Sequence, residues 1–101
     1  MTGTKHDDGK PPISLIPPEA LWEEAQVMGF GEKKYGTWNW TKGLSIIRLC
    51  SAAMRHTLQF LMGQDTDEET GLSHLAHARC CLGMALWMHK YRKDLDDRLK
   101  K

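Results

Sequence analysis

The chain has 101 residues, 41% hydrophobic and 27% charged, with a formal net charge of +1. This length predicts one domain whose small core needs good packing or another copy, and this composition excludes a disordered tail and a strongly basic nucleic-acid binder. The start of the chain lacks the apolar stretch of a secretory signal, and no run reaches the ~18 apolar residues of a membrane span, so we expect a cytoplasmic protein with no membrane or nucleic-acid partner.

The amino-terminal part divides into an arm and the start of a helix. Residues 1–16 are polar, charged and proline-bearing, which predicts an arm that becomes ordered only by lying on the domain or on a ligand. Residues 17–101 are expected to form a single helical domain. Its first helix should begin at residues 17–19, because proline is tolerated in a first turn and an acid is favoured there by the helix dipole. Gly29 and Gly31 are expected to interrupt this helix.

A loop rich in tryptophan follows at residues 37–43. Trp38 and Trp40 are costly to expose, so at least one of them should be packed or should cover a ligand. An aromatic face beside the amide of Asn39, with Tyr35 just upstream, is also what is needed to hold a nucleobase by stacking and edge hydrogen bonds. Both core packing and base recognition remain open for this group.

The second helix is predicted from Ser45, a good N-cap, to Leu61 or Met62, with Gly63 as its terminator. It is apolar around most of its circumference, so we expect it to be surrounded by other packed elements. A polar stripe interrupts this surface, with His56 at its edge; its members are spaced by three or four residues and are Arg48, Ser51, Arg55 and Gln59.

The third helix is predicted from about Ser73 to Tyr91, folding back antiparallel to the second across an acidic loop at residues 63–71. One of its faces carries leucines, and a second carries His74, His77, Cys81, Met84 and Met88. The three cysteines are an odd number, which favours buried thiols over a disulfide framework. The sequence therefore predicts an all-α fold, a small antiparallel bundle of three main helices plus short turns, completed by homo-oligomerisation to a dimer or tetramer.

The strongest candidate site lies where the acidic loop meets the third helix. Histidines at i and i+3 near a helix start share one side of the first turns, and the adjoining loop supplies carboxylates. A mixed oxygen and nitrogen shell of this kind suits Mn²⁺, Zn²⁺ or Fe²⁺, and Mg²⁺ if the histidines only support the oxygen ligands. The predicted metal ligands are His56, Asp67, Glu69, His74 and His77. Solvated surface acids that hydrogen-bond a helix-start histidine are the competing interpretation.

A second group of candidate residues is cationic and consists of Lys5, Lys10, Lys34, Arg48 and Arg55. Two arginines on one face of an apolar helix must meet either internal carboxylates, for which Asp67 and Glu69 are the expected partners, or an external anion. A phosphate chain fits the external case, because guanidinium groups bind phosphate oxygens in pairs. Solvated surface positions remain the alternative for the lysines.

Several motifs in a fixed order carry a family resemblance: residues 5–11 (KHDDGKP), residues 30–36 (FGEKKYG) with Asn39 and Trp40, Arg55 with His56, and residues 67–78 (DEETGLSHLAHA). From Lys5 to about Lys90 the chain resembles a family of small phage proteins, the dATP/dGTP diphosphohydrolase N-terminal domains. The resemblance implies cleavage of a purine deoxynucleoside triphosphate to the monophosphate and pyrophosphate, as in the all-helical MazG-like enzymes. Those enzymes hold Mg²⁺ with E-E-x-x-E and E-x-x-D motifs, from which this sequence departs at residues 23–27 and 74–77.

Together, the resemblance and the residue chemistry predict that residues 17–101 bind a nucleotide and act as a metal-dependent pyrophosphohydrolase with a divalent ion, Mg²⁺ or Mn²⁺ first and Zn²⁺ as an alternative. Asp67, Glu69 and His74 are the expected catalytic residues. The cationic group would neutralise the phosphates, and Tyr35, Asn39 and Trp40 would hold the base. The alternative is a binding protein that sequesters a host immune signalling nucleotide without cleaving it.

Overall fold

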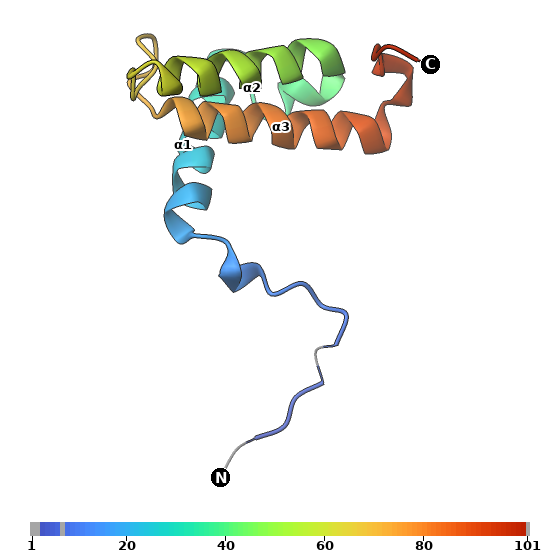
Figure 1. Cartoon of the computed structure of the whole chain (residues 1–101). Coiled ribbons are helices and arrows are strands. Elements are labelled where there is room, and N and C mark those ends of the chain that lie inside the picture. Colours follow the sequence, from blue (N-terminus) through green and yellow to red (C-terminus); the bar gives the residue numbers. More distant parts are fainter. Residues whose placement is uncertain (1–2, 7, 101) are drawn as a thin grey trace.

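The computed structural model describes residues 3–6 and 8–100 and shows three α-helices preceded by an extended arm (Figure 1). Asp7, from the motif at residues 5–11, lies outside the described residues, as do residues 1–2 and 101 of the predicted arm and domain. The described part contains no β pairing except an isolated bridge between Thr66 and Ser73, so the predicted all-α class is confirmed. The helices are α1 (Pro18–Tyr35), α2 (Ile46–Leu61) and α3 (His74–Tyr91), with short 3-10 turns η1 (Ile13–Leu15), η2 (Asn39–Lys42) and η3 (Lys93–Leu95).

Helices α2 and α3 lie side by side and antiparallel, as predicted (Figure 1). Each begins at a serine cap: Ser45 Oγ accepts the backbone N–H of Arg48 at 3.2 Å, and Ser73 Oγ accepts that of Leu75 at 3.1 Å. Gly63 follows α2 with a φ of 98°, which a residue with a side chain rarely adopts. Local capping chemistry therefore fixes both ends of the turn that joins the two helices.

Helix α1 is continuous, so the predicted interruption at Gly29 and Gly31 is wrong. A glycine within a helix costs about 1 kcal/mol relative to alanine. Here, the packing of the preceding turn offsets that cost, because Val27 is buried against α3 and Met28 packs beside it. The helix ends only at Gly36, whose φ of 100° leaves the helical region.

The core lies on both sides of α3, which packs against α1 and against α2. One cluster joins Val27 of α1 to Ala76 and Cys80, and the other joins α2 to the second half of α3 around Met88. Within the described single chain, other elements do not surround α2 on every side. Its outer side is exposed, with Met54 and Leu61 each more than 70% accessible.

The segment after α3 fixes the beginning of α2 at the end far from the acidic turn. The Arg92 guanidinium donates to the Lys42 carbonyl at 2.8 Å, and the Asp97 carboxylate accepts the backbone N–H of Ile47 at 3.0 Å and the hydroxyl of Ser45. Gly43, with a φ of 130°, lets this segment approach closely. The start of α2 is thus held by carboxylate capping as well as by its own serine.

All three cysteines are free thiols, as predicted. Cys80 is buried between α1 and α3, where its thiol donates to the Met28 sulfur at 3.1 Å, and burial raises its pKa to about 12. Such a thiol is protonated and unreactive, so it serves as a packing residue. No helix in the described part of the chain combines the length and apolar character needed to cross a lipid bilayer.

Candidate functional site

The turn between α2 and α3 is organised around the Asp67 carboxylate. Its Oδ2 accepts the backbone N–H groups of Glu69 and Thr70, both at 3.0 Å, and lies 3.3 Å from the Thr70 hydroxyl. The backbone of Asp67 also bonds to Leu72 and Gly71, which closes the turn. Asp67 is therefore held in place by its own turn and is half-buried.

Three imidazoles meet beside this turn, one from α2 and two from the first turn of α3. His74 is 1% exposed, and its Nδ1 lies 2.8 Å from Nδ1 of His56. The His77 ring stacks on that of His56, with centroids 4.6 Å apart and planes 14° from parallel. The predicted convergence of the histidines across the two helices is therefore present.

Two residues that the sequence analysis did not single out set the hydrogen bonding of these rings. Nε2 of His74 lies 3.3 Å from the Gln64 side-chain oxygen, so with that amide orientation Nε2 carries the proton and Nδ1 keeps a lone pair. Nε2 of His77 lies 2.7 Å from the Thr70 hydroxyl. Gln64 and Thr70 lie in a turn, where no helical repeat predicts which side chains meet. The sequence therefore indicated the site only through the neighbouring acids and histidines.

The surroundings of the cluster favour neutral imidazoles at His56 and His77 and an ionised carboxylate at Asp67. Burial lowers the pKa of His56 and of His77, and neighbouring imidazoles lower that of His56 further. Burial alone would raise the pKa of Asp67, but hydrogen bonds from Thr70 and Glu69 and the nearby imidazoles outweigh it and lower the pKa below its usual value. Neutral imidazoles beside a carboxylate are the protonation states that metal ligation requires.

The donor atoms of His56, Asp67 and His74 lie within 4.8 Å of one another, close enough to share one ion. Two imidazole nitrogens and one carboxylate oxygen are a donor set that divalent transition ions accept. His77 is not part of this group, and its Nε2 is hydrogen-bonded to the Thr70 hydroxyl. Glu69 is exposed and pairs with Lys34 at 3.0 Å, which places it at the edge of the cluster.

Two hollows adjoin the cluster, and Glu69 borders both. An open cavity of about 720 Å³ is lined by His74, Asp67, Glu68, Glu69, Gln59 and Gln64. A larger and mainly apolar groove of about 920 Å³ runs between the end of α1, η2 and α3. Its polar rim contains Lys34, Tyr35, Asn39, Glu69, Thr70 and His77. The residues predicted to hold a base therefore share a groove with residues of the predicted metal site.

The two loop tryptophans have different roles in this groove. Trp40 packs edge-on against Trp87 of α3, with ring centroids 5.1 Å apart, and belongs to the core. Trp38 is 66% exposed and adopts a left-handed backbone conformation with a φ of 59°. The prediction that at least one tryptophan is packed is confirmed. An exposed indole in a strained conformation at the groove is the feature that core packing does not explain.

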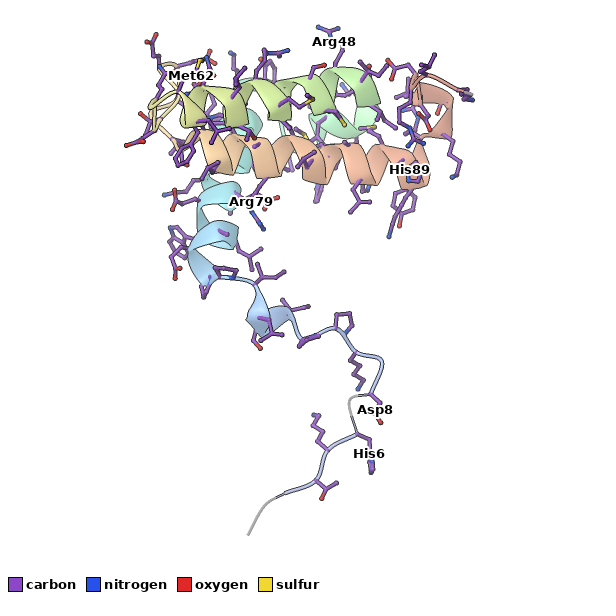
Figure 2. The ribbon with its side chains drawn as sticks, viewed as in Figure 1. His6, Asp8, Arg48, Met62, Arg79 and His89 are labelled. Carbon is purple, nitrogen blue, oxygen red and sulfur yellow. The ribbon has the colours of Figure 1, made fainter. Side chains whose placement is uncertain are left out.

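The predicted cationic group is mostly not at the site. Only Lys34 lines the groove; Arg48 and Arg55 are exposed, and Figure 2 shows Arg48 on the side of α2 that faces away from α3. Of the two kinds of partner that the sequence left open for these arginines, the internal one is not present, because Asp67 accepts bonds within its own turn and Glu69 pairs with Lys34. Lys5 and Lys10 are exposed in the arm that leads away from the helices (Figure 1).

Comparison with known proteins identifies a matching family and one similar protein. Residues 1–98 match the family described as "dATP/dGTP diphosphohydrolase, N-terminal". The chain is 48% identical over 98 residues to a protein of Salmonella phage PMBT28 named dATP/dGTP diphosphohydrolase. This match covers 97% of the chain and 33% of the phage protein, so the chain spans about a third of the length of that relative. No solved structure matches significantly.

Proposed function

The chain belongs to the family of dATP/dGTP diphosphohydrolase N-terminal domains, as its motifs predict, and from this premise we propose that it is a phage-type, metal-dependent nucleotide pyrophosphohydrolase. The proposed substrates are purine deoxynucleoside triphosphates. Attack of water on the α-phosphorus and cleavage of its bond to the bridging oxygen would release the nucleoside monophosphate and pyrophosphate. The observation that carries the proposal is the cluster of His56, Asp67 and His74 beside an aromatic groove.

In this proposal, His56, Asp67 and His74 hold a divalent ion, with Glu69 and His77 at the border of the site. A bound ion would polarise the phosphoanhydride and orient the attacking water. Two imidazole donors favour Mn²⁺ or Zn²⁺ over Mg²⁺, which prefers oxygen ligands. Gln64 supports this role, because its hydrogen bond to Nε2 of His74 keeps the lone pair on Nδ1, which would exchange its hydrogen bond with His56 for the ion.

The groove is proposed to hold the nucleoside. Tyr35 and Trp38 present exposed rings on which a base can stack, and the Asn39 amide can both donate to and accept from a purine edge. Trp40 supports this wall from the core side. Lys34 would neutralise phosphate charge after exchanging its partner, Glu69, for the phosphate oxygens.

Chromatography of reaction products tests the activity. The purified chain is incubated with each dNTP and Mn²⁺, and dAMP or dGMP with pyrophosphate is expected from the purine substrates. Asp67→Asn should abolish turnover, whereas the control Asp65→Asn, at an exposed position of the same turn, should not. Intact nucleotide recovered from denatured protein would assign the chain to nucleotide sequestration instead, and no bound nucleotide of any kind would refute both.

A further inference from the structure

The outer face of α2 is apolar and basic, and nothing in the described chain covers it. Its residues are spaced by three, four or seven along the helix, so they lie on one side. Met54, Leu58 and Leu61 are each more than half exposed, which is unusual for a contiguous apolar stripe on a monomer. The face consists of Ile47, Arg48, Met54, Arg55, Leu58, Leu61 and Met62.

The projecting face of α1 is apolar and acidic. Glu19, Trp22 and Glu23 are spaced by three and four residues, so they lie together on one side of the helix, and all three are exposed. Trp22 is 72% accessible, and η1 just before it carries further exposed apolar side chains. Figure 1 shows that this half of α1 extends away from the α2–α3 pair. A tryptophan flanked by two carboxylates is thereby accessible for contact with a partner.

These two faces cannot meet within one chain. Helix α1 packs against α3, whereas the outer face of α2 points away from α3, as Arg48 shows in Figure 2. No ion pair in the described chain involves Glu19, Glu23, Arg48 or Arg55. Two carboxylates and two guanidinium groups thus remain unpaired on faces that are otherwise apolar.

We propose that the occupant of each face is a second copy of this chain, with the projecting face of α1 of one copy packed on the outer face of α2 of another. Packing α2 on α2 would place arginines opposite arginines, and packing α1 on α1 would place glutamates opposite glutamates. Repulsion between like charges therefore favours the pairing of α1 with α2. Trp22 would anchor the contact among the leucines and methionines of α2. Because the two faces differ, the contact is head-to-tail and forms a closed ring or an open chain of copies. This proposal does not depend on the nucleotide chemistry.

Charge reversal with complementation tests the interface. By sedimentation velocity, the wild-type chain should be oligomeric, and both Glu19→Arg/Glu23→Arg and Arg48→Glu/Arg55→Glu should weaken association on the order of 100-fold. Mixing the two variants should restore the oligomer, because each mixed contact again joins acid to base. Trp22→Ala should dissociate the protein while its circular dichroism stays helical.

Reversal of two exposed lysines elsewhere, Lys90→Glu/Lys93→Glu, is the matched control and should leave the oligomer intact. Restoration on mixing separates a specific interface from misfolding, since misfolded variants would not complement each other. A monomeric wild-type chain at high concentration overturns the proposal, and so does an oligomer that survives both reversals. Failure of two folded variants to associate on mixing would also overturn it.

Discussion

Replacing Asp67 by asparagine separates the structural role of this carboxylate from its proposed role as a ligand. The ionised carboxylate accepts two backbone N–H groups at 3.0 Å, from Glu69 and Thr70. Asparagine retains one oxygen in nearly the same place, so both bonds can form but lose their charge assistance. The turn should therefore keep its conformation, while the charge that would bind a metal disappears.

The expected loss of stability follows from those two bonds. Hydrogen bonds to charged groups contribute about 1.5–3 kcal/mol and neutral ones about 0.5–1.5 kcal/mol, so Asp67→Asn should cost about 1–2 kcal/mol for a half-buried pair. For a domain of this size, that corresponds to a fall in Tm of roughly 5–15 °C. Metal affinity should fall by more than about 100-fold, because even a residue that only supports a ligand contributes 10–100-fold.

Calorimetric melting in EDTA measures the first effect, and titration with Mn²⁺ measures the second. Because the folded-state pKa of Asp67 is depressed, its contribution to stability is present above its unfolded pKa and is lost as the pH falls through the folded value. The stability difference between wild type and Asp67→Asn should thus be complete at neutral pH and shrink below about pH 4. A variant with unchanged Mn²⁺ affinity would refute the assignment of Asp67 as a ligand.

Three further predictions test the surroundings of the site. Because the pKa values of His56 and His77 are lowered in the folded state, the unfolded chain binds more protons than the folded chain. The free energy of unfolding in EDTA should therefore fall as the pH is lowered from about 7 to about 5. A rise over this range would contradict buried neutral rings. Trp38→Ala should weaken nucleotide binding by about 1–3 kcal/mol with little change in Tm, because Trp38 is exposed. Trp40→Ala should lower the free energy of unfolding by about 3–5 kcal/mol, because Trp40 packs on Trp87. Equal losses of Tm in the two variants would refute their different roles. Gly43→Ala should lower the free energy of unfolding, measured in urea, by about 1–3 kcal/mol, because the φ of Gly43 is 130° and a Cβ would lie 2.7 Å from a leucine side chain. Unchanged stability would refute this close approach.

Local chemistry was sufficient to predict α2 and α3. Ser45, Gly63 and Ser73 act through their own backbone neighbours, so caps and terminators are visible in the sequence. The histidine cluster also followed from local spacing, since His74 and His77 share a helix turn and the short connection returns α3 beside His56. The site was therefore predictable where a short turn dictates which side chains meet.

Long-range packing accounts for what the sequence did not reveal. Gly29 and Gly31 were predicted to interrupt α1, but burial of Val27 on α3 outweighs their weak helix propensity. For the arginines of α2, the sequence left open whether internal carboxylates or an external anion would pair with them. Periodicity shows that a face needs burial, and it does not show whether the same chain or another copy provides it.

The most direct test of the proposed metal site is anomalous diffraction from crystals of the chain grown with Mn²⁺ and a non-hydrolysable dATP analogue. The site predicts a manganese peak within coordination distance of His56, Asp67 and His74, with the base in the groove beside Trp38 and Asn39. Well-ordered side chains at saturating Mn²⁺ with no peak among them, and His56 still hydrogen-bonded to His74, would contradict it.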